Sequence, residues 1–254
     1  MNLVSIGRLA ASAALIATLA FAQKQPQPKS QKEVEALQAM FNAPTADARI
    51  AAAEDLLKKF ADTEFKAITL YMLTVSAEEK NDYEKIVVYG ERTLEANPKD
   101  YAVMLILARN IASKTREFDL DKEEKLGRAE KYATEAIALA KVAPKPRPDI
   151  PDDQWAAAQK DFEAQGHQAL AIAATVRKKT DVAIKEYELA ISTAAQVDQA
   201  DRVRLAAAYN SAGRHDDAIK VLDEALADPQ LNPAIRNVAT NEKMKAAKMK
   251  EAKK

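Results

Sequence analysis

The chain has 254 residues, of which 48% are hydrophobic and 30% are charged, and its formal net charge is zero. This balance provides no strong positive field, which argues against nucleic acid as a partner. The sequence contains no cysteine, which excludes disulfides, thiolate metal sites and a cysteine nucleophile.

The first 22 residues have the layout of a secretory signal peptide. Arg8 is their only charged residue, an apolar run extends from Leu9 to Ala22, and Ala20-Phe21-Ala22 forms a small-x-small cleavage site. The run is shorter than the roughly 20 residues that span a bilayer. We therefore expect residues 1–22 to be removed and the protein to be exported to the periplasm or cell envelope. The alternative is an uncleaved segment that anchors a membrane-associated assembly element in the inner membrane.

Residues 23–30 (QKQPQPKS) are polar and contain two prolines, which predicts a flexible linker. From Gln31 onwards the apolar residues recur with helical spacing. The predicted helices occupy residues 31–43, 47–60, 64–77, 82–96, 101–113, 126–140, 153–178 and 180–195, two shorter stretches within 205–228, and 233–250. A charged insert at 114–125 (KTREFDLDKEEK) and a proline-rich loop at 144–151 interrupt the pattern.

The stretch from Leu205 to Pro229, LAAAYNSAGRHDDAIKVLDEALADP, predicts a helical hairpin. Gly213 permits the turn, and Pro229 ends the second helix. In residue type and spacing this hairpin resembles the tetratricopeptide repeat. Equivalent positions in successive second helices are Ala52, Ile86, Ala129, Ala183 and Ala218, at steps of 34, 43, 54 and 35 residues. The repeat period of the family is about 34 residues, and the two longer steps contain the charged insert and the proline-rich loop.

The resemblance covers about residues 31–229 and implies an all-α, right-handed α-solenoid of about five hairpins over residues 31–232. A C-terminal helix with a lysine-rich tail, residues 233–254, would close the array. In such arrays the first helix of each hairpin lines a concave groove that binds another protein or a peptide. By resemblance, the groove residues are Ile68, Tyr71, Val75, Leu105, Arg109, Gln168, Ile172, Thr175, Val203, Ala207 and Asn210.

The resemblance therefore implies a non-enzymatic interaction scaffold without a cofactor, and it leaves the oligomeric state open. One subclass of the family clamps the terminal carboxylate of its partner with lysine and asparagine. The matching positions here hold Tyr71, Val75, Leu105 and Arg109, so the clamp is absent. A glycan ligand would need aromatic platforms in the groove, and only Tyr71 qualifies.

No motif in the sequence predicts a catalytic or metal site. The two histidines lack metal-ligand spacing, and the five glycines are isolated, so they form no phosphate-binding loop. His215 precedes two helix-start acids and is expected to be a solvated turn residue, whereas His167 is expected to be partly buried or to line the groove.

Two further features have two interpretations each. Trp155, the only tryptophan, is expected to pack against the proline-rich loop, and the alternative is an exposed anchor for a partner. The lysine-rich tail is expected to cap the last repeat, and the alternative is weak contact with an anionic membrane surface.

Overall fold

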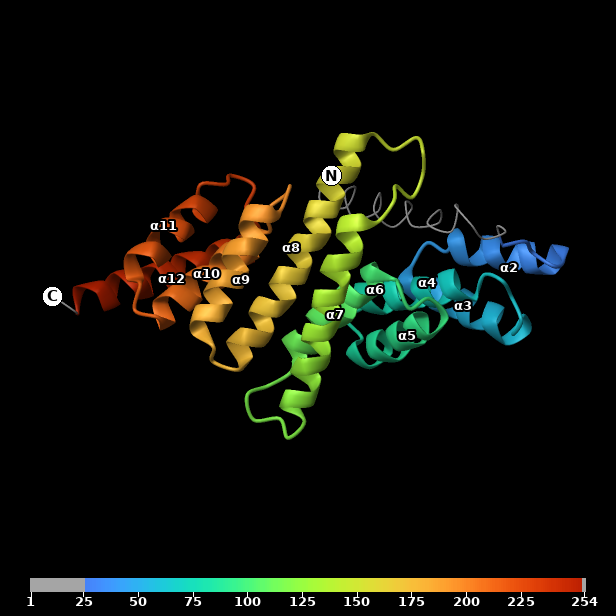
Figure 1. The fold of residues 1–254 in the computed structure, drawn as a ribbon, viewed down its shortest axis with the longest axis horizontal. Coiled ribbons are helices and arrows are strands. Elements are labelled where there is room, and N and C mark those ends of the chain that lie inside the picture. Colours follow the sequence, from blue (N-terminus) through green and yellow to red (C-terminus); the bar gives the residue numbers. More distant parts are fainter. Residues whose placement is uncertain (1–25, 253–254) are drawn as a thin grey trace. The chain divides into compact units, whose positions relative to one another are not determined.

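The computed structural model describes residues 26–252 (Figure 1). Within these residues there are eleven α-helices and no strand. The predicted signal peptide, residues 1–22, lies outside the described residues. The helices are α2 (Gln31–Phe41), α3 (Ala46–Lys59), α4 (Lys66–Glu79), α5 (Tyr83–Ala96), α6 (Tyr101–Lys114), α7 (Lys122–Val142), α8 (Asp152–Val176), α9 (Thr180–Thr193), α10 (Gln199–Ser211), α11 (His215–Leu226) and α12 (Pro233–Glu251).

The helices form two compact units. Unit 1 contains the described residues up to Leu107 together with Val142–Ala156, and unit 2 contains Ala108–Lys141 and the residues from Ala157 onwards. In unit 1, α2 packs on α3, α3 on α4, and α4 on α5. In unit 2, α9 packs on α10, α10 on α11, and α11 on α12. Each unit is thus a succession of helical hairpins, as predicted for an all-α solenoid fold.

Local side-chain caps determine where several helices begin. The Thr45 hydroxyl accepts a hydrogen bond from the Ala48 N–H at 3.1 Å, at the start of α3. The Asn232 side chain accepts one from the Ala234 N–H at 2.9 Å, and Pro233 occupies the first position of α12. Such caps satisfy N–H groups that have no partner within the helix, so these boundaries can be predicted from the sequence.

Three hairpin turns share one backbone geometry. Asn81, Lys178 and Gly213 have φ angles of 54°, 58° and 74°, and each follows the end of a first helix. After each of them the next N–H donates back to a carbonyl five residues earlier, as Arg214 does to Tyr209 at 2.9 Å. This is the Schellman motif. The predicted role of Gly213 is confirmed, and two non-glycine residues adopt the same left-handed conformation.

The charged insert is shorter than predicted, because α7 begins at Lys122 instead of Leu126. Glu123 and Glu124 lie in the first turn of this helix, where acidic side chains interact favourably with the helix dipole. Only residues 115–121 form the loop between α6 and α7. The first turn of α7 has no apolar spacing, so the periodicity did not reveal it.

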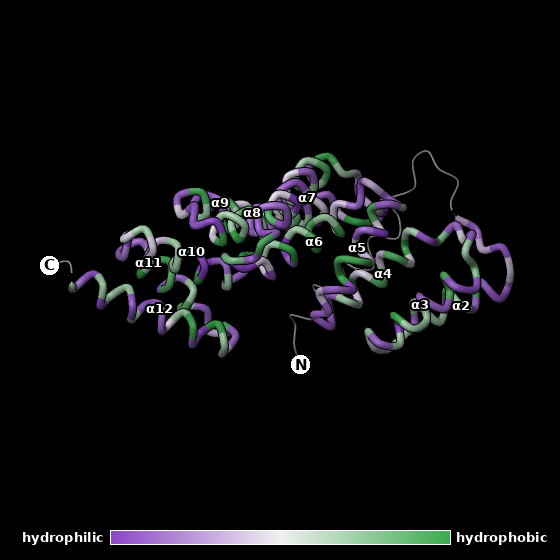
Figure 2. Tube along the Cα trace, turned by 90° about the horizontal axis from the view of Figure 1, so that it is seen from below, coloured by the Kyte–Doolittle hydropathy of each residue, from purple (hydrophilic) through white to green (hydrophobic). Residues whose placement is uncertain are grey.

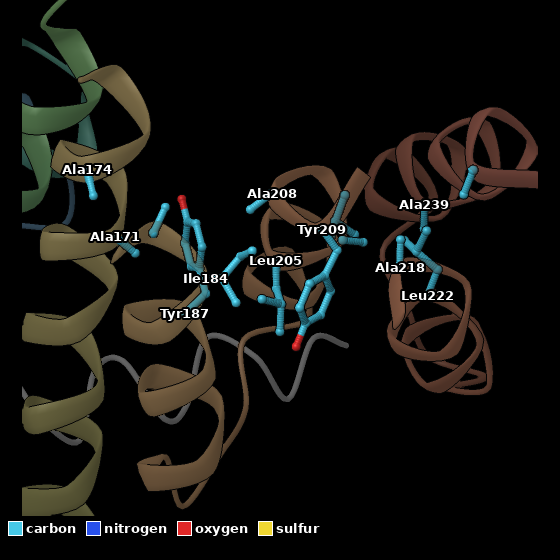
Figure 3. Close-up of a cluster of buried hydrophobic side chains, with 14 residues drawn as sticks. Ala171, Ala174, Ile184, Tyr187, Leu205, Ala208, Tyr209, Ala218, Leu222 and Ala239 are labelled. Atoms are coloured by element: carbon cyan, nitrogen blue, oxygen red, sulfur yellow. The ribbon is translucent and has the colours of Figure 1, made fainter. Parts of the chain in front are cut away.

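The core of unit 2 combines small residues with a few large ones. Ala206, Ala218 and Leu222 are completely buried, and Tyr187 and Tyr209 belong to the same cluster. Figure 3 shows Tyr187 beside Ile184 and Tyr209 beside Leu205. Burial raises the pKa of both tyrosine hydroxyls to about 12. Alanines at contact positions let the helices approach closely, while the larger side chains fill the remaining space.

The helix α12 covers the end of unit 2. Its fully buried residues are Ala239 and Ala246, which join the core of α10 and α11, and much of the helix is hydrophilic (Figure 2). Lys243 pairs with Asp223 at 2.5 Å, and Lys250 pairs with Asp216 at 2.5 Å. These contacts favour the interpretation of the lysine-rich tail as a cap, because two of its cations bind acidic residues of α11.

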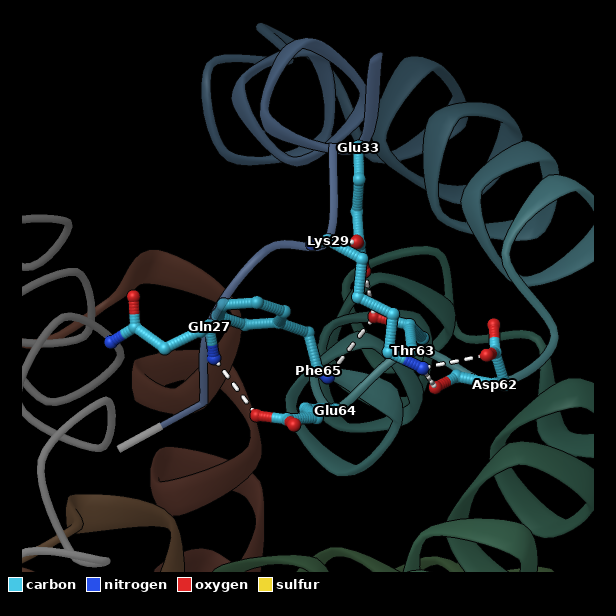
Figure 4. A network of polar contacts seen from close by, with 7 residues as sticks. All are labelled: Gln27, Lys29, Glu33, Asp62, Thr63, Glu64 and Phe65. Atoms are coloured by element: carbon cyan, nitrogen blue, oxygen red, sulfur yellow. Dashed lines mark hydrogen bonds and ion pairs between the residues drawn. The ribbon is translucent and has the colours of Figure 1, made fainter. Parts of the chain in front are cut away.

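The described part of the predicted linker is attached to the loop between α3 and α4 (Figure 4). The Gln27 N–H donates to Glu64 at 2.9 Å, and the Lys29 side chain pairs with Asp62 at 2.6 Å. Glu33, which is completely buried, accepts hydrogen bonds from the Thr63 hydroxyl at 2.5 Å and from the Lys29 N–H at 2.6 Å. Residues 27–30 therefore belong to the folded part of unit 1.

The loop between α7 and α8 contains the proline-rich segment and has no regular secondary structure. The indole N–H of Trp155 donates to the Ala143 carbonyl at 3.1 Å, and the Lys145 side chain pairs with Asp152 at 2.5 Å. The tryptophan is half-buried. The contact to the start of this loop favours a packing role for Trp155 over an exposed anchor.

Candidate functional site

Two of the four predicted groove residues of unit 1 are inaccessible. Tyr71 on α4 is 5% exposed and Leu105 on α6 is 3% exposed, whereas Ile68 and Val75 are half-buried. Because a partner cannot contact a side chain that its own fold already covers, Tyr71 and Leu105 are core residues in this structure. The prediction that these two residues line an open groove is corrected accordingly.

Buried polar groups beside Tyr71 have a structural role. Asp100 is buried and precedes α6, where its carboxylate accepts hydrogen bonds from the Val103 N–H at 3.1 Å and from the Asn97 side chain at 3.4 Å. Burial raises the pKa of Asp100, and burial followed by the negative charge of Asp100 raises the pKa of the Tyr71 hydroxyl. These bonds cap α6, so the buried carboxyl belongs to the framework of the fold.

In unit 2 the predicted residue Gln168 forms part of a buried polar pair. Its side-chain N–H₂ donates to both carboxylate oxygens of Asp201, at 2.8 and 2.9 Å, and so joins α8 to α10. Arg204 contacts the same carboxylate at 2.8 Å, with 43% of its own side chain exposed. Burial raises the pKa of Asp201 despite these partners. Sequence reasoning missed Asp201, which looks like an ordinary acidic residue in the first turn of a helix.

A second polar group connects α10, α11 and α12. The side chain of Asn210, which is 2% exposed, donates to the Glu242 carboxylate at 2.9 Å, and Lys245 pairs with the same carboxylate at 3.2 Å. The Asn210 side-chain oxygen lies 3.2 Å from Nδ1 of His215. Asn210 thus connects α10 to α11 and α12. It was predicted to line the groove, and its burial corrects that prediction.

The prediction that His215 is a solvated turn residue is wrong. His215 is 4% exposed and is the first residue of α11, and its ring lies against the Asn210 side chain. Its Nε2 atom is buried without a hydrogen-bond partner among the described residues. His167 is partly buried as expected, and its Nδ1 lies 2.7 Å from the Glu186 carboxylate.

The remaining predicted residues of unit 2 differ in accessibility. Thr175 is exposed, Arg109, Ile172 and Ala207 are half-buried, and Val203 is buried. Together with the two cations anchored on the polar groups, the accessible residues of α8, α10 and α12 form a surface that we call the first-helix face of unit 2. It consists of Ile172, Thr175, Arg204, Ala207 and Lys245.

Two hollows of the described surface are lined by residues outside this face. One of about 340 Å³ lies between α4 and α5, where Leu70, Lys66 and Arg92 contribute to its lining. Another, of about 420 Å³, lies at the turn between α8 and α9. In residues 26–252 there is no cluster of three or more acidic or histidine side chains that could hold a metal ion. Over the same range, no helix is long and apolar enough to cross a membrane.

The succession of hairpins, the Schellman turns and the small residues at helix contacts define the chain as an all-α protein of tetratricopeptide-like hairpins. No family model and no curated protein matches the sequence. Among solved structures, the chain is similar to a thermophilic TPR protein of Thermus thermophilus. The two are 18% identical, the match covers 83% of this chain and 98% of the other, and the TM-score is 0.49. The fold assignment therefore rests on the helices and turns of this chain.

Proposed function

We propose that the protein is a non-enzymatic scaffold of the bacterial cell envelope that binds another protein along the first-helix face of unit 2. The observation that carries this proposal is the pair of polar groups beneath that face. Gln168 and Asp201 orient Arg204, and Asn210 and Glu242 orient Lys245. Pre-organised side chains lose little conformational freedom when a partner binds, which is an advantage for a recognition surface.

The chemistry of this face favours a particular kind of partner. Ile172 and Ala207 offer half-buried apolar surface, and Thr175 adds an exposed hydroxyl. Arg204 and Lys245 are 43% and 55% exposed at the side chain. A helix or an extended segment with apolar anchors and neighbouring carboxylates would complement this combination.

The envelope location rests on the sequence of residues 1–22. Its test is the N-terminal residue of the native protein, determined by mass spectrometry. Gln23 would support cleavage and an exported scaffold. Met1 would support the alternative, a membrane-associated assembly element anchored by the apolar run that begins at Leu9.

A cross-linked pull-down from the envelope fraction tests partner binding. The bait is residues 23–254, compared with the Ala207→Arg variant, which places a long cation on the first-helix face. Val182→Arg is the matched control, because Val182 is 46% exposed on α9 and lies outside this face. A partner retained by the wild type and the control but lost by Ala207→Arg supports the proposal. Equal recovery by all three chains would refute binding at this face.

A further inference from the structure

The loop between α6 and α7 exposes two large apolar side chains to solvent. Phe118 is 88% exposed and Leu120 is fully exposed. Together they present roughly 300–400 Å² of apolar surface, a patch of the size that is often functional on a monomer. Neither side chain contributes to the core of its unit, so the fold of this chain does not explain them.

The loop is nevertheless well ordered by its polar residues. The Arg116 N–H donates to the Asp119 carboxylate at 3.0 Å, and the Thr115 hydroxyl donates to the Ile111 carbonyl at 2.7 Å. Lys125 pairs with Asp121 at 2.9 Å, and Glu117 pairs with Lys178 at 2.6 Å. The backbone that carries Phe118 and Leu120 is therefore fixed at several points along its length, which reduces the entropy lost on binding.

The charged surroundings of the two apolar residues are predominantly acidic. Residues 115–125 contain five acidic and three basic side chains. Lys122 and Lys125 are only 26% and 29% exposed, whereas Asp121 and Glu123 are 52% and 66% exposed. The two lysines thus lie back against the fold, whereas the carboxylates of Asp121 and Glu123 extend into solvent; Asp119 is 27% exposed, and Arg116 is an exposed cation of the same loop. An acidic border repels an anionic lipid surface and complements a basic one.

We propose that Phe118 and Leu120 are a recognition element that inserts into an apolar pocket, bordered by lysine or arginine, on another protein. The exposed apolar area is well below the roughly 800 Å² per partner of a standard stable interface, so pairing of two copies through this loop alone would be weak. Two adjacent anchors of this kind instead match the small, pocket-filling clusters that dominate many interfaces. Phe118 and Leu120 are not among the residues of the first-helix face of unit 2.

Site-specific photo-cross-linking of the full-length chain in its own cells tests this inference. A benzophenone amino acid replaces Phe118 in one chain and, as a control, the exposed Val182 in another. We expect one protein adduct from position 118 that is absent from position 182. A second substitution, Leu120→Asp, should abolish the adduct, whereas Leu120→Met should retain it, because methionine preserves an apolar side chain of similar size.

Binding of the captured protein, once purified, then provides the quantitative test. We expect Phe118→Asp with Leu120→Asp to weaken its binding about 100-fold or more, as for loss of an interface hot spot. Glu124→Lys, at an exposed acidic residue whose side chain is not among the pairs that fix the loop, should weaken it severalfold through lost charge complementarity. Both variants should keep the wild-type circular dichroism spectrum, since the substituted side chains are exposed.

Several results would overturn the inference. They are no adduct at position 118, an adduct of two copies of this chain, and equal affinity of the wild type and the double aspartate variant. Flotation of the chain with phosphatidylcholine or phosphatidylglycerol vesicles, lost in the double aspartate variant, would assign the loop to a membrane and likewise overturn it.

Discussion

Gly166 on α8 lies directly against Ile137 on α7. A Cβ atom added to Gly166 would be 2.4 Å from Ile137 Cγ1 and 2.7 Å from its Cδ1, with the Ala133 carbonyl at 3.3 Å. The helix α8 runs without interruption through this position. The glycine therefore permits a close approach between the two helices.

Gly166→Ala should destabilise the protein, because the added methyl group would force Ile137 or the backbone to move. We expect a loss of about 1–3 kcal/mol, the usual cost of overpacking, measured by urea unfolding. In a chain that already carries Ile137→Ala, the Gly166→Ala substitution should cost less stability than it does in the wild type. Gly127→Ala is the control, since a Cβ atom at Gly127 would have no neighbour within 4 Å. It should stabilise α7 by about 0.5–1 kcal/mol, and similar effects of the two alanines would contradict the packing argument.

Asp201 predicts a specific pH dependence. Burial raises the pKa of its carboxyl in the folded state above the ordinary value of 3.8, so between these two pKa values the folded state binds more protons than the unfolded one. The free energy of unfolding contributed by this group is therefore greatest below pH 3.8 and falls as the pH rises through the folded pKa.

Asp201→Asn removes this titration and keeps an acceptor for Gln168. The stability of the variant relative to the wild type should rise with pH across that window and become constant above it. Urea unfolding of both chains at several pH values between about 3 and 8 measures the difference, in which contributions from other groups such as Asp100 largely cancel. A difference that stays flat, or that falls with pH, would contradict the assignment.

The shared Schellman turns predict opposite effects of two substitutions. Lys178 has a left-handed backbone with a φ angle of 58°, which costs a non-glycine residue about 1–2 kcal/mol. Lys178→Gly should stabilise the protein by about 0.5–1 kcal/mol, and Gly213→Ala should destabilise it by about 1 kcal/mol. Lys178→Ala separates the backbone effect from the ion pair with Glu117, because alanine keeps the strain and loses the pair. If glycine and alanine at 178 are equally stable, backbone strain is not the cause.

Arg177 predicts a strong dependence on one side chain at the end of α8. The Arg177 side chain is only 11% exposed. Its guanidinium pairs with Glu123 at 2.7 Å and also with Glu130, both on α7. Arg177→Met should lower the melting temperature clearly more than Lys178→Ala, whose ion pair is largely exposed. Thermal melts in low salt and in about 1 M salt, where exposed pairs are screened, measure both effects. Equal shifts for the two variants would show that the paired guanidinium has no special role.

The sequence predicts the helices of this fold better than its accessible surface. Helix starts such as Pro233 depend on caps and on spacing within a few residues, which are local properties. The exposure of Tyr71 and the direction of His215 depend on neighbouring helices, which a repeat pattern does not describe. Asp201 was missed for the same reason, because only the packing of α8 on α10 brings it to Gln168.

The helix α12 has a consequence for the size of the molecule. A stack of similar hairpins has no internal reason to end, since each hairpin offers the next one an apolar face. Here Ala239 and Ala246 cover that face, whereas Lys248 on the same helix is exposed. The amphipathic helix α12 thus limits the number of hairpins in the array. A chain that ends at Leu231 should expose this face of α10 and α11 to solvent and associate with other molecules through it.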